Sequence, residues 1–370
     1  MQIDPNKYLR YLNIPSLMGM NRTNKILKVN PTVPPQREEA SQVKVSIYDY
    51  DANGINEYKF DNVAECFKFN VSQRMTWINI DGLRKSDVEA VCQHFNVHFL
   101  ITEDILSINQ RPKMDEIEGV LYCLLNMLYF NDISKTVEAE QISIVVGKNF
   151  LLSFQEDASR DVFDPIRQKL HMPKSYVRTR GSDYLCYSML DLIVDNYFVV
   201  MEKLGEEIEA LEEEVIRRSN TRSLARINQL RKEMIILKRN ITPVRDLING
   251  ILRSESELLN KKTMKYFKDI YDHIAQANDL SENYRDIMMS MQDLYINNVN
   301  LRMNEVMKVL AIVTCLLAPA TVISGMFGMN FEVIPFAHNR WAFYIVAGAM
   351  LLIPLWMLWV FKRRGWFQKR

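Results

Sequence analysis

The chain is 370 residues long, and its 46 lysine and arginine residues nearly balance its 45 aspartate and glutamate residues. This length allows two or three domains, and the balanced charge gives no reason to expect nucleic acid as a partner. The five cysteines are far apart and form no Cys-x-x-Cys pair, which argues against structural zinc and a disulfide framework. The sequence has no P-loop, Gly-rich dinucleotide turn or HExxH, so no motif predicts an enzyme.

The N-terminal part is expected to form an α/β domain. Residues 1–42 are polar and rich in proline, which predicts a loosely ordered lead-in without a secretory signal. Alternating apolar and polar residues then predict strands, with one helix at 86–94 among them. The predicted strands are 43–48, 57–60, 76–80, 119–130, 141–146 and 150–155. We therefore place a cytoplasmic α/β domain at 43–180.

The middle of the chain has a helical pattern. Two antiparallel helices are predicted at 183–218 and 221–252, within a segment that we limit to 181–254. Apolar residues recur at helical spacing through the acidic run 206–214, which indicates an amphipathic helix. The acidic run is typical of a solvated helix face, and it could also attract cations.

A third, much longer helix is predicted to begin near Glu255, since no proline follows until Pro319. If it continues to Phe327, it is about 100 Å long at 1.5 Å per residue. One small domain cannot bury such a helix, so we expect a stalk at 255–327 that enters the membrane and packs against copies of itself. The alternative is a break near Asn297 and Asn298.

Two uncharged apolar runs, 309–327 and 341–361, are each close to the about 20 residues that cross a bilayer as a helix. A short loop, 328–340, joins them. Basic residues follow the second run in the tail 362–370, whereas the loop contains only Arg340. The positive-inside rule then places both termini in the cytoplasm and the loop outside. The basic tail is either a topology anchor or a contributor to the potential at the cytoplasmic mouth.

Small and polar residues share one face of the first span. They recur at spacings of three and four, which is the helical period: Asn304, Met307, Leu310, Thr314, Ala318, Thr321, Gly325 and Gly328. In membranes such a face is typical of tight helix packing, and it can also line a pore. Because two spans cannot enclose a water path alone, a pore requires an oligomer with this face inward.

The loop sequence Phe327-Gly328-Met329-Asn330-Phe331-Glu332, placed between the last two spans, resembles the signature of the CorA family of divalent cation transport proteins. The resemblance extends upstream through Asn304–Leu310 and covers about Val43 to Trp366. It implies an α+β protein: a funnel-shaped homopentamer in the bacterial inner membrane, with a cytoplasmic α/β domain, a helical stalk and two C-terminal membrane helices. Mg²⁺ would be both the transported and the regulatory ion, with Co²⁺ or Ni²⁺ as further transported ions.

The same resemblance assigns functions to individual residues. The selectivity filter would be Gly328, Met329 and Asn330, and the stripe from Asn304 to Gly325 would line the pore. Mg²⁺ holds its water shell tightly, so a ring of neutral Asn330 amides can accept hydrogen bonds from those waters without removing them. Asn330 also suits a helix C-terminal cap. Glu332 is the loop acid, since Ile334–Ala337 replaces the second acidic stretch of many relatives.

Carboxylates in the cytoplasmic part resemble the inter-subunit metal site of the family. Asp104 and Asp269 match its two principal positions, and Glu103, Asp191 and His273 match more variable ones. The alternative is that Glu103 or Asp104 caps the start of a helix and that Asp269 is an ordinary surface residue.

Two other functions remain compatible with these patterns. A zinc or proton-coupled transporter would share the architecture, although family members specialised for zinc often have valine at the position of Met329. A membrane-anchored scaffold would use the acidic helix to bind partners, but an anchor does not need the aligned polar residues of the first span.

Overall fold

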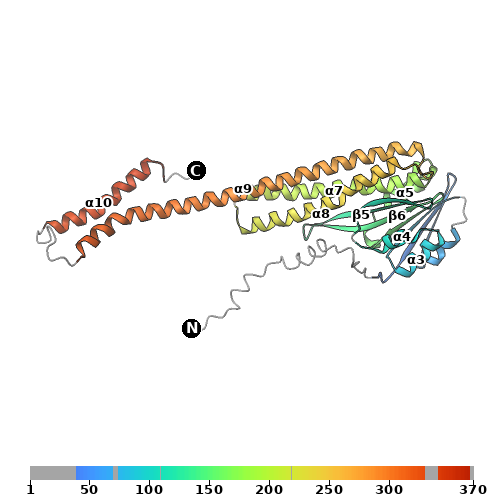
Figure 1. Cartoon of the computed structure of the whole chain (residues 1–370), viewed down its shortest axis with the longest axis horizontal. Helices are drawn as coiled ribbons and strands as arrows, with labels where there is room; N and C mark the ends of the chain where they lie inside the picture. The colour runs from blue at the N-terminus through green and yellow to red at the C-terminus, as the bar shows by residue number, and fades with distance from the viewer. Residues whose placement is uncertain (1–38, 70–73, 109, 218, 330–340, 367–370) are drawn as a thin grey trace, which may run out of the picture. The chain divides into compact units, whose positions relative to one another are not determined.

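The computed structural model describes residues 39–69, 74–108, 110–217, 219–329 and 341–366. The predictions for Asn330, Glu332 and the loop as far as Arg340 lie outside these residues. The chain divides into two compact units (Figure 1). The first contains Met1–Glu213 and Ala225–Met289, and the second contains Glu214–Leu224 and Ser290–Arg370. The boundary therefore passes through the long helices and not through the connections at 180 or 254.

The first unit is built on a seven-stranded sheet of order β2-β1-β3-β7-β6-β5-β4. Only β3 and β7 are parallel, and the other neighbours are antiparallel. The strands are β1 Lys44–Tyr50, β2 Ile55–Phe60, β3 Met75–Asp81, β4 Lys113–Ile117, β5 Val120–Asn131, β6 Thr136–Val146 and β7 Phe150–Gln155. Six of them were predicted; the edge strand β4 was missed because its apolar residues, Met114 and Ile117, are three positions apart and do not alternate with polar ones.

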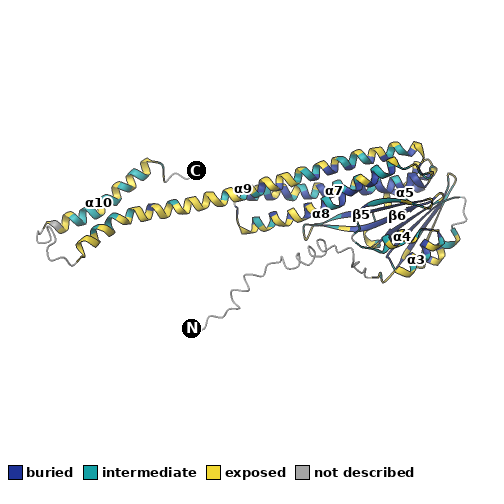
Figure 2. Cartoon of the chain, in the orientation of Figure 1, coloured by how far each residue is buried: buried dark blue, intermediate teal, exposed yellow. Residues whose placement is uncertain are grey.

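Helices cover both faces of this sheet. One face packs against η2 (Val63–Phe69), α3 (Lys85–His94) and α4 (Phe99–Leu106), with side chains such as Val88 and Ile101 in a common core. Figure 2 shows the buried residues concentrated in the sheet and in the helices of the first unit. The shorter elements η3 (Ala158–Arg160), α5 (Asp164–His171) and α6 (Tyr176–Thr179) follow the last strand. The ordered domain also begins before residue 43, because Arg84 donates hydrogen bonds to the carbonyls of Ala40 and Ser41.

The other face carries the two predicted helices, α7 (Ser182–Arg217) and α8 (Thr221–Arg253), and α9 (Lys261–Phe327) packs against both. Polar contacts fix their register within the first unit. The Asn126 amide of β5 donates to Asn240 Oδ1 of α8 at 2.7 Å, and Thr242 of α8 donates to Asn278 Oδ1 of α9 at 2.9 Å. The Tyr284 hydroxyl of α9 donates to the Met201 carbonyl of α7.

Helix α9 runs without interruption from Lys261 to Phe327, which is about 100 Å. It begins six residues later than predicted, because the side chain of Asn260 caps its start by accepting from the Lys262 N–H at 2.9 Å. The alternative of a break at Asn297 and Asn298 is wrong, and Pro319 lies inside the helix.

In the second unit, the corner between α7 and α8 is bound to α9. Asn298 Nδ2 donates to the Val215 carbonyl and to Ser219 Oγ, both at 3.0 Å. Arg302 donates to the Ser219 carbonyl. The Val215 carbonyl also accepts from Ser219 Oγ at 2.8 Å, so α9 adds further donors to carbonyls in the last turn of α7 and just after it.

Among the residues that the structure describes, three helices are long and apolar enough to cross a membrane, but they differ in burial. The apolar window of α7 is 61% buried inside the protein, whereas that of α9 is 6% buried and that of α10 is 0%. Helix α10 covers Ala342–Arg363, so it extends two residues beyond the predicted span and includes Lys362 and Arg363. The C-terminal part of α9 and helix α10 are therefore the transmembrane helices.

A buried polar network lies at the end of β3. Asp81 Oδ1 accepts hydrogen bonds from the side-chain amides of Asn79 and Gln155, at 3.0 and 2.9 Å. Burial raises the pKa of Asp81 to about 6, and the nearby Asp161 adds to this rise against the opposing effects of the hydrogen bonds and Arg167. At neutral pH the carboxylate is still mostly ionised, but its ionisation is less favourable in the folded protein than in the unfolded chain, so it lowers stability.

We predict that Asp81→Asn stabilises the protein at pH 7.5. An upward shift of about two pKa units lowers the free energy of unfolding by about 2–3 kcal/mol. This loss is complete when the pH is above the pKa of the folded protein, and it vanishes when the pH is below the pKa of the unfolded chain. The gain in the midpoint of thermal unfolding in detergent should therefore shrink as the pH falls from 7.5 to 4. Asp132→Asn, on an exposed side chain, removes the same charge and should show little pH-dependent gain. A gain for Asp81→Asn that is equal at both pH values would contradict this account.

Candidate functional site

The first candidate metal ligands lie on the short helix α4. His98 caps this helix, since its Nδ1 accepts from the Leu100 N–H, so neither Glu103 nor Asp104 has the capping role considered as an alternative. Glu103 is exposed. Asp104 is half-buried, and its carboxylate lies 2.6 Å from Lys113 Nζ on β4. Within one chain, the negative charge of Asp104 is therefore already compensated.

Lys113 also contacts a second carboxylate, that of Asp115 at 3.2 Å. Burial lowers the pKa of Lys113, but the hydrogen bonds and charges of Asp104 and Asp115 outweigh this effect, and the net pKa is raised. Lys113 is thus a firmly protonated ammonium that competes with any cation for Asp104. Sequence reasoning missed it because β4 itself was not predicted.

Asp269 lies on α9 in the first unit, where its side chain is exposed. The structure of the single chain pairs Asp104 with Lys113 and not with Asp269. The inter-subunit pair expected from the family resemblance therefore stays a prediction that involves a second copy of the chain.

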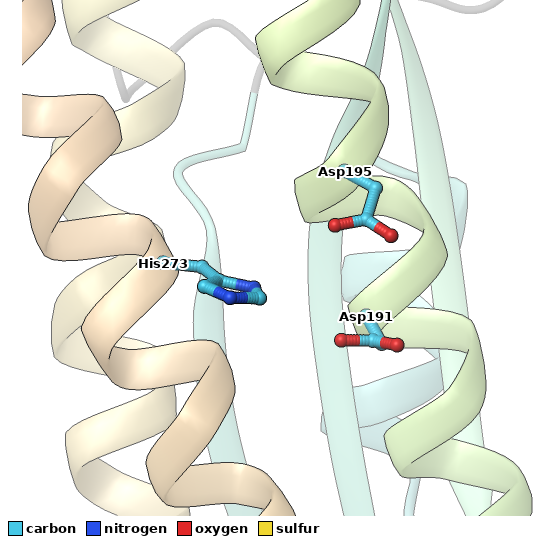
Figure 3. A group of neighbouring side chains, drawn as sticks. All are labelled: Asp191, Asp195 and His273. Atoms are coloured by element: carbon cyan, nitrogen blue, oxygen red, sulfur yellow. The ribbon is translucent and has the colours of Figure 1, made fainter.

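Three side chains that can bind a metal come together between α7 and α9. Figure 3 shows Asp191 and Asp195 on one helix facing His273 on the other. One ligand atom from each residue can be chosen so that all three lie within 4.8 Å of one another. Two of these residues, Asp191 and His273, were named from the sequence as lower-ranked candidates, and the structure places them together.

The electrostatics of this cluster suit a bound cation. The pKa of Asp191 is raised, first by burial and then by the neighbouring Asp195 carboxylate, while Tyr187 and His273 oppose the rise. Tyr187 donates a hydrogen bond to Asp191 Oδ2 at 3.3 Å. The Nδ1 atom of His273 is buried and has no hydrogen-bond partner within the described part of the chain. A divalent cation would offset the repulsion of the two carboxylates, and an imidazole nitrogen beside carboxylates suits Co²⁺ or Ni²⁺ better than Mg²⁺.

Asp195 was the functional candidate that sequence reasoning missed. The sequence did contain an indication of it, since Asp191 and Asp195 are four residues apart on one predicted helix and therefore share a face. His273 likewise lies four residues after Asp269 on α9. What the sequence lacked was the packing of α7 against α9, which decides that these two faces meet.

The polar stripe of the first membrane helix lies on one continuous helix. Seven of its residues, Asn304 to Gly325, lie within α9, so their spacing does place them on one face. Because most of α9 is exposed from Leu294 to Phe327, burial does not single out this face. The hydroxyls of Thr314 and Thr321 donate to the Leu310 and Leu317 carbonyls, which leaves the lone pairs of the hydroxyl oxygens free to accept from water.

Helix α9 ends just before the Gly-Met-Asn sequence. The Gly328 N–H donates to the Ser324 carbonyl at 3.0 Å, and a Cβ atom at Gly328 would lie 3.2 Å from that same carbonyl oxygen. A glycine thus allows a close turn at the end of the span. Met329 is exposed, while Asn330 and Glu332 lie outside the described residues.

A mixed sheet flanked by helices, a long helix that enters the membrane and a second membrane helix define a class of membrane transport proteins. The family model described as CorA-like Mg²⁺ transporter protein matches residues 72–363. The chain belongs to the CorA family.

Individual relatives agree with this assignment. The chain is 37% identical to the cobalt/magnesium transport protein CorA of Thermotoga maritima, over 87% of this chain and 92% of the relative. It is 25% identical to the protein of the same name from Methanocaldococcus jannaschii, over 79% and 92%. The complete structure of the CorA magnesium transporter from that organism has the same fold, with a TM-score of 0.71 at 24% identity over 87% of this chain and 98% of the other. These relatives are transport proteins.

We predict that Lys113→Gln increases the affinity of the first unit for divalent cations. Removal of a unit charge near Asp104 eliminates a repulsion of about 1 kcal/mol at 4 Å in water, which corresponds to about fivefold in affinity. The concentration of Mg²⁺ that half-protects the protein from limited proteolysis should fall by this factor. Lys113→Arg keeps the charge and serves as the control. An unchanged midpoint for Lys113→Gln would show that Asp104 takes no part in cation binding.

Proposed function

We propose that this chain is the subunit of a homopentameric channel for the uptake of Mg²⁺ across the bacterial inner membrane, with both termini in the cytoplasm. Co²⁺ and Ni²⁺ would share the pathway. The observation that carries this proposal is the unbroken α9, which places Asn304, just before the apolar membrane segment, on the same helix face as Thr314 and Thr321 within that segment. The names and similarity of the relatives support the choice of ion.

The proposed selection acts on the hydrated ion. Mg²⁺ releases its waters reluctantly, so a pore that conducts it rapidly does best by binding those waters. Neutral acceptors, such as the Asn330 amide and the threonine hydroxyls, bind the hydrated ion weakly enough to let it leave. Further along the same face, Met307 and Leu310 would form an apolar constriction that stays dry when the channel is closed.

We predict that Asn330→Ala abolishes Mg²⁺ uptake while the oligomer still assembles, because alanine has no side-chain acceptor for the ion's waters. The measurement is Mg²⁺ flux into proteoliposomes, with native mass determination in detergent as the test of assembly. Asn330→Gln keeps an amide and is the matched control. Flux close to wild type in Asn330→Ala would exclude the selectivity role, and a monomer or dimer in the wild type would exclude the pentamer.

The same flux assay separates the alternatives. A Mg²⁺ channel should be inhibited by Co²⁺ and Ni²⁺, whereas a zinc transporter should carry Zn²⁺ in preference to Mg²⁺ and a proton-coupled one should respond to a pH gradient. A membrane-anchored scaffold should show no flux at all. Met329, in place of the valine of many zinc transporters, argues against the zinc alternative.

We further propose that cytoplasmic Mg²⁺ regulates the channel through Asp104 and Asp269 of neighbouring subunits. A bound ion would cancel the repulsion between the two carboxylates and stabilise the closed state. Without the ion, that repulsion is about 1 kcal/mol at 4 Å in water and about 4 kcal/mol at an effective dielectric constant of 20. Repeated around a ring, it is large enough to bias a gating equilibrium of a few kcal/mol.

We predict that Asp269→Lys mimics the regulatory ion, because its ammonium would pair with Asp104 across the interface. The variant should resist limited proteolysis without Mg²⁺, whereas the wild type should need Mg²⁺ for the same protection. Asp272→Lys, with the same charge change on an exposed residue three positions further along α9, is the control. If the wild type shows no Mg²⁺-dependent protection, the regulatory proposal is wrong whatever ion the pore conducts.

A further inference from the structure

The C-terminal end of α10 has a defined structure beyond its apolar span. Gly365 has a φ of 75°, a conformation that glycine adopts without strain. The Gly365 N–H donates to the Lys362 carbonyl, and the Trp366 N–H donates to the Phe361 carbonyl, both at 3.1 Å. This is a Schellman-type ending, in which a glycine with positive φ reverses the chain and satisfies the last carbonyls of the helix.

The reversed chain places an aromatic ring at the end of the membrane helix. The rings of Phe361 and Trp366 are stacked, with their centroids 4.9 Å apart and an angle of 7° between their planes. Trp366 keeps 40% of its surface exposed. A tryptophan that packs one face on an apolar side chain and leaves its edge open is suited to the boundary between hydrocarbon and headgroups.

Three basic residues lie between Phe361 and Trp366 in the chain. Lys362, Arg363 and Arg364 are all exposed, and none of them forms an ion pair with the described residues. The sequence has no aspartate or glutamate after Glu332, so this end of the helix has no acidic neighbour in the following chain. The Arg363 guanidinium lies 5.4 Å from the ring centroid of Trp359, one turn earlier, which keeps its charge close to the helix end.

We infer that this end, residues 361–366, is a binding surface for the phosphate of acidic phospholipid headgroups. Arginine binds phosphate through two parallel hydrogen bonds, and basic clusters directly after a membrane helix attract anionic lipids. The surface continues the apolar exterior of α10, none of whose apolar window is buried. The lipid that surrounds the span offers negatively charged phosphates at the level of the helix end. The inference needs only the insertion of α10 and not a particular transported ion.

The test uses the full chain in phosphatidylcholine vesicles that contain a small fraction of pyrene-labelled lipid. The same labelled acyl chain is carried either by phosphatidylglycerol or by phosphatidylcholine, and energy transfer from the protein's tryptophans reports how much of each lies nearby. Because each basic residue near an anionic surface strengthens association by about fivefold, the wild type should favour phosphatidylglycerol at least about threefold. This preference should decrease as NaCl is raised, because salt screens exposed charges.

The combined variant Lys362→Gln, Arg363→Gln and Arg364→Gln keeps every tryptophan and should reduce the ratio to about one. The matched control removes three exposed charges from α8 instead, as Arg222→Gln, Arg231→Gln and Lys232→Gln, and should keep the wild-type ratio. If the wild type shows no preference, or one that salt does not change, the inference is wrong without the need of any variant. It is equally wrong if the α10 variant keeps the preference. It is also wrong if, in the wild type, the three basic residues of α10 crosslink to the acidic run 206–214 of another copy.

Discussion

The absence of water in the hydrocarbon core of a bilayer is the constraint on which the C-terminal half of this chain depends. Every backbone N–H and C=O there must be bonded within the protein, and a single helix meets this requirement only if it is continuous. Helix α9 is continuous from Lys261 to Phe327 and meets it except at Pro319, which has no N–H and leaves the carbonyl one turn earlier in need of another partner. Asp269 and Asn304 therefore belong to one continuous helix.

A second consequence of the bilayer concerns the polar face of α9. Threonine hydroxyls in hydrocarbon need partners, and Thr314 and Thr321 obtain them from carbonyls one turn earlier in the same helix. This makes the single helix compatible with lipid while leaving acceptor oxygens on its surface. The proposed pore uses those remaining acceptors, and the proposed pentamer brings the five faces together around water.

The acidic groups of the first unit follow a different rule, because each carboxylate that loses water needs another source of stabilisation. Glu140 obtains it from the N–H groups of Glu156 and Asp157, and Asp104 obtains it from Lys113. Asp191 and Asp195 raise each other's energy and face a histidine with an unpaired nitrogen. A carboxylate pair of this kind, in a chain of the CorA family, is where a divalent cation would be most stabilising.

The sequence by itself determined the membrane helices, the stalk and most of the sheet, because these depend on local periodicity and on the lengths of apolar runs. It also placed the polar residues of α9 on one face, since helical spacing alone decides this. The start of α9 at Lys261 escaped prediction because it depends on the local cap at Asn260. Strand β4 escaped because its five residues show no alternation of apolar and polar side chains. Only the tertiary structure brought Asp195 to His273 and Lys113 to Asp104, because these contacts join elements that are remote in sequence or unmarked by any periodic pattern.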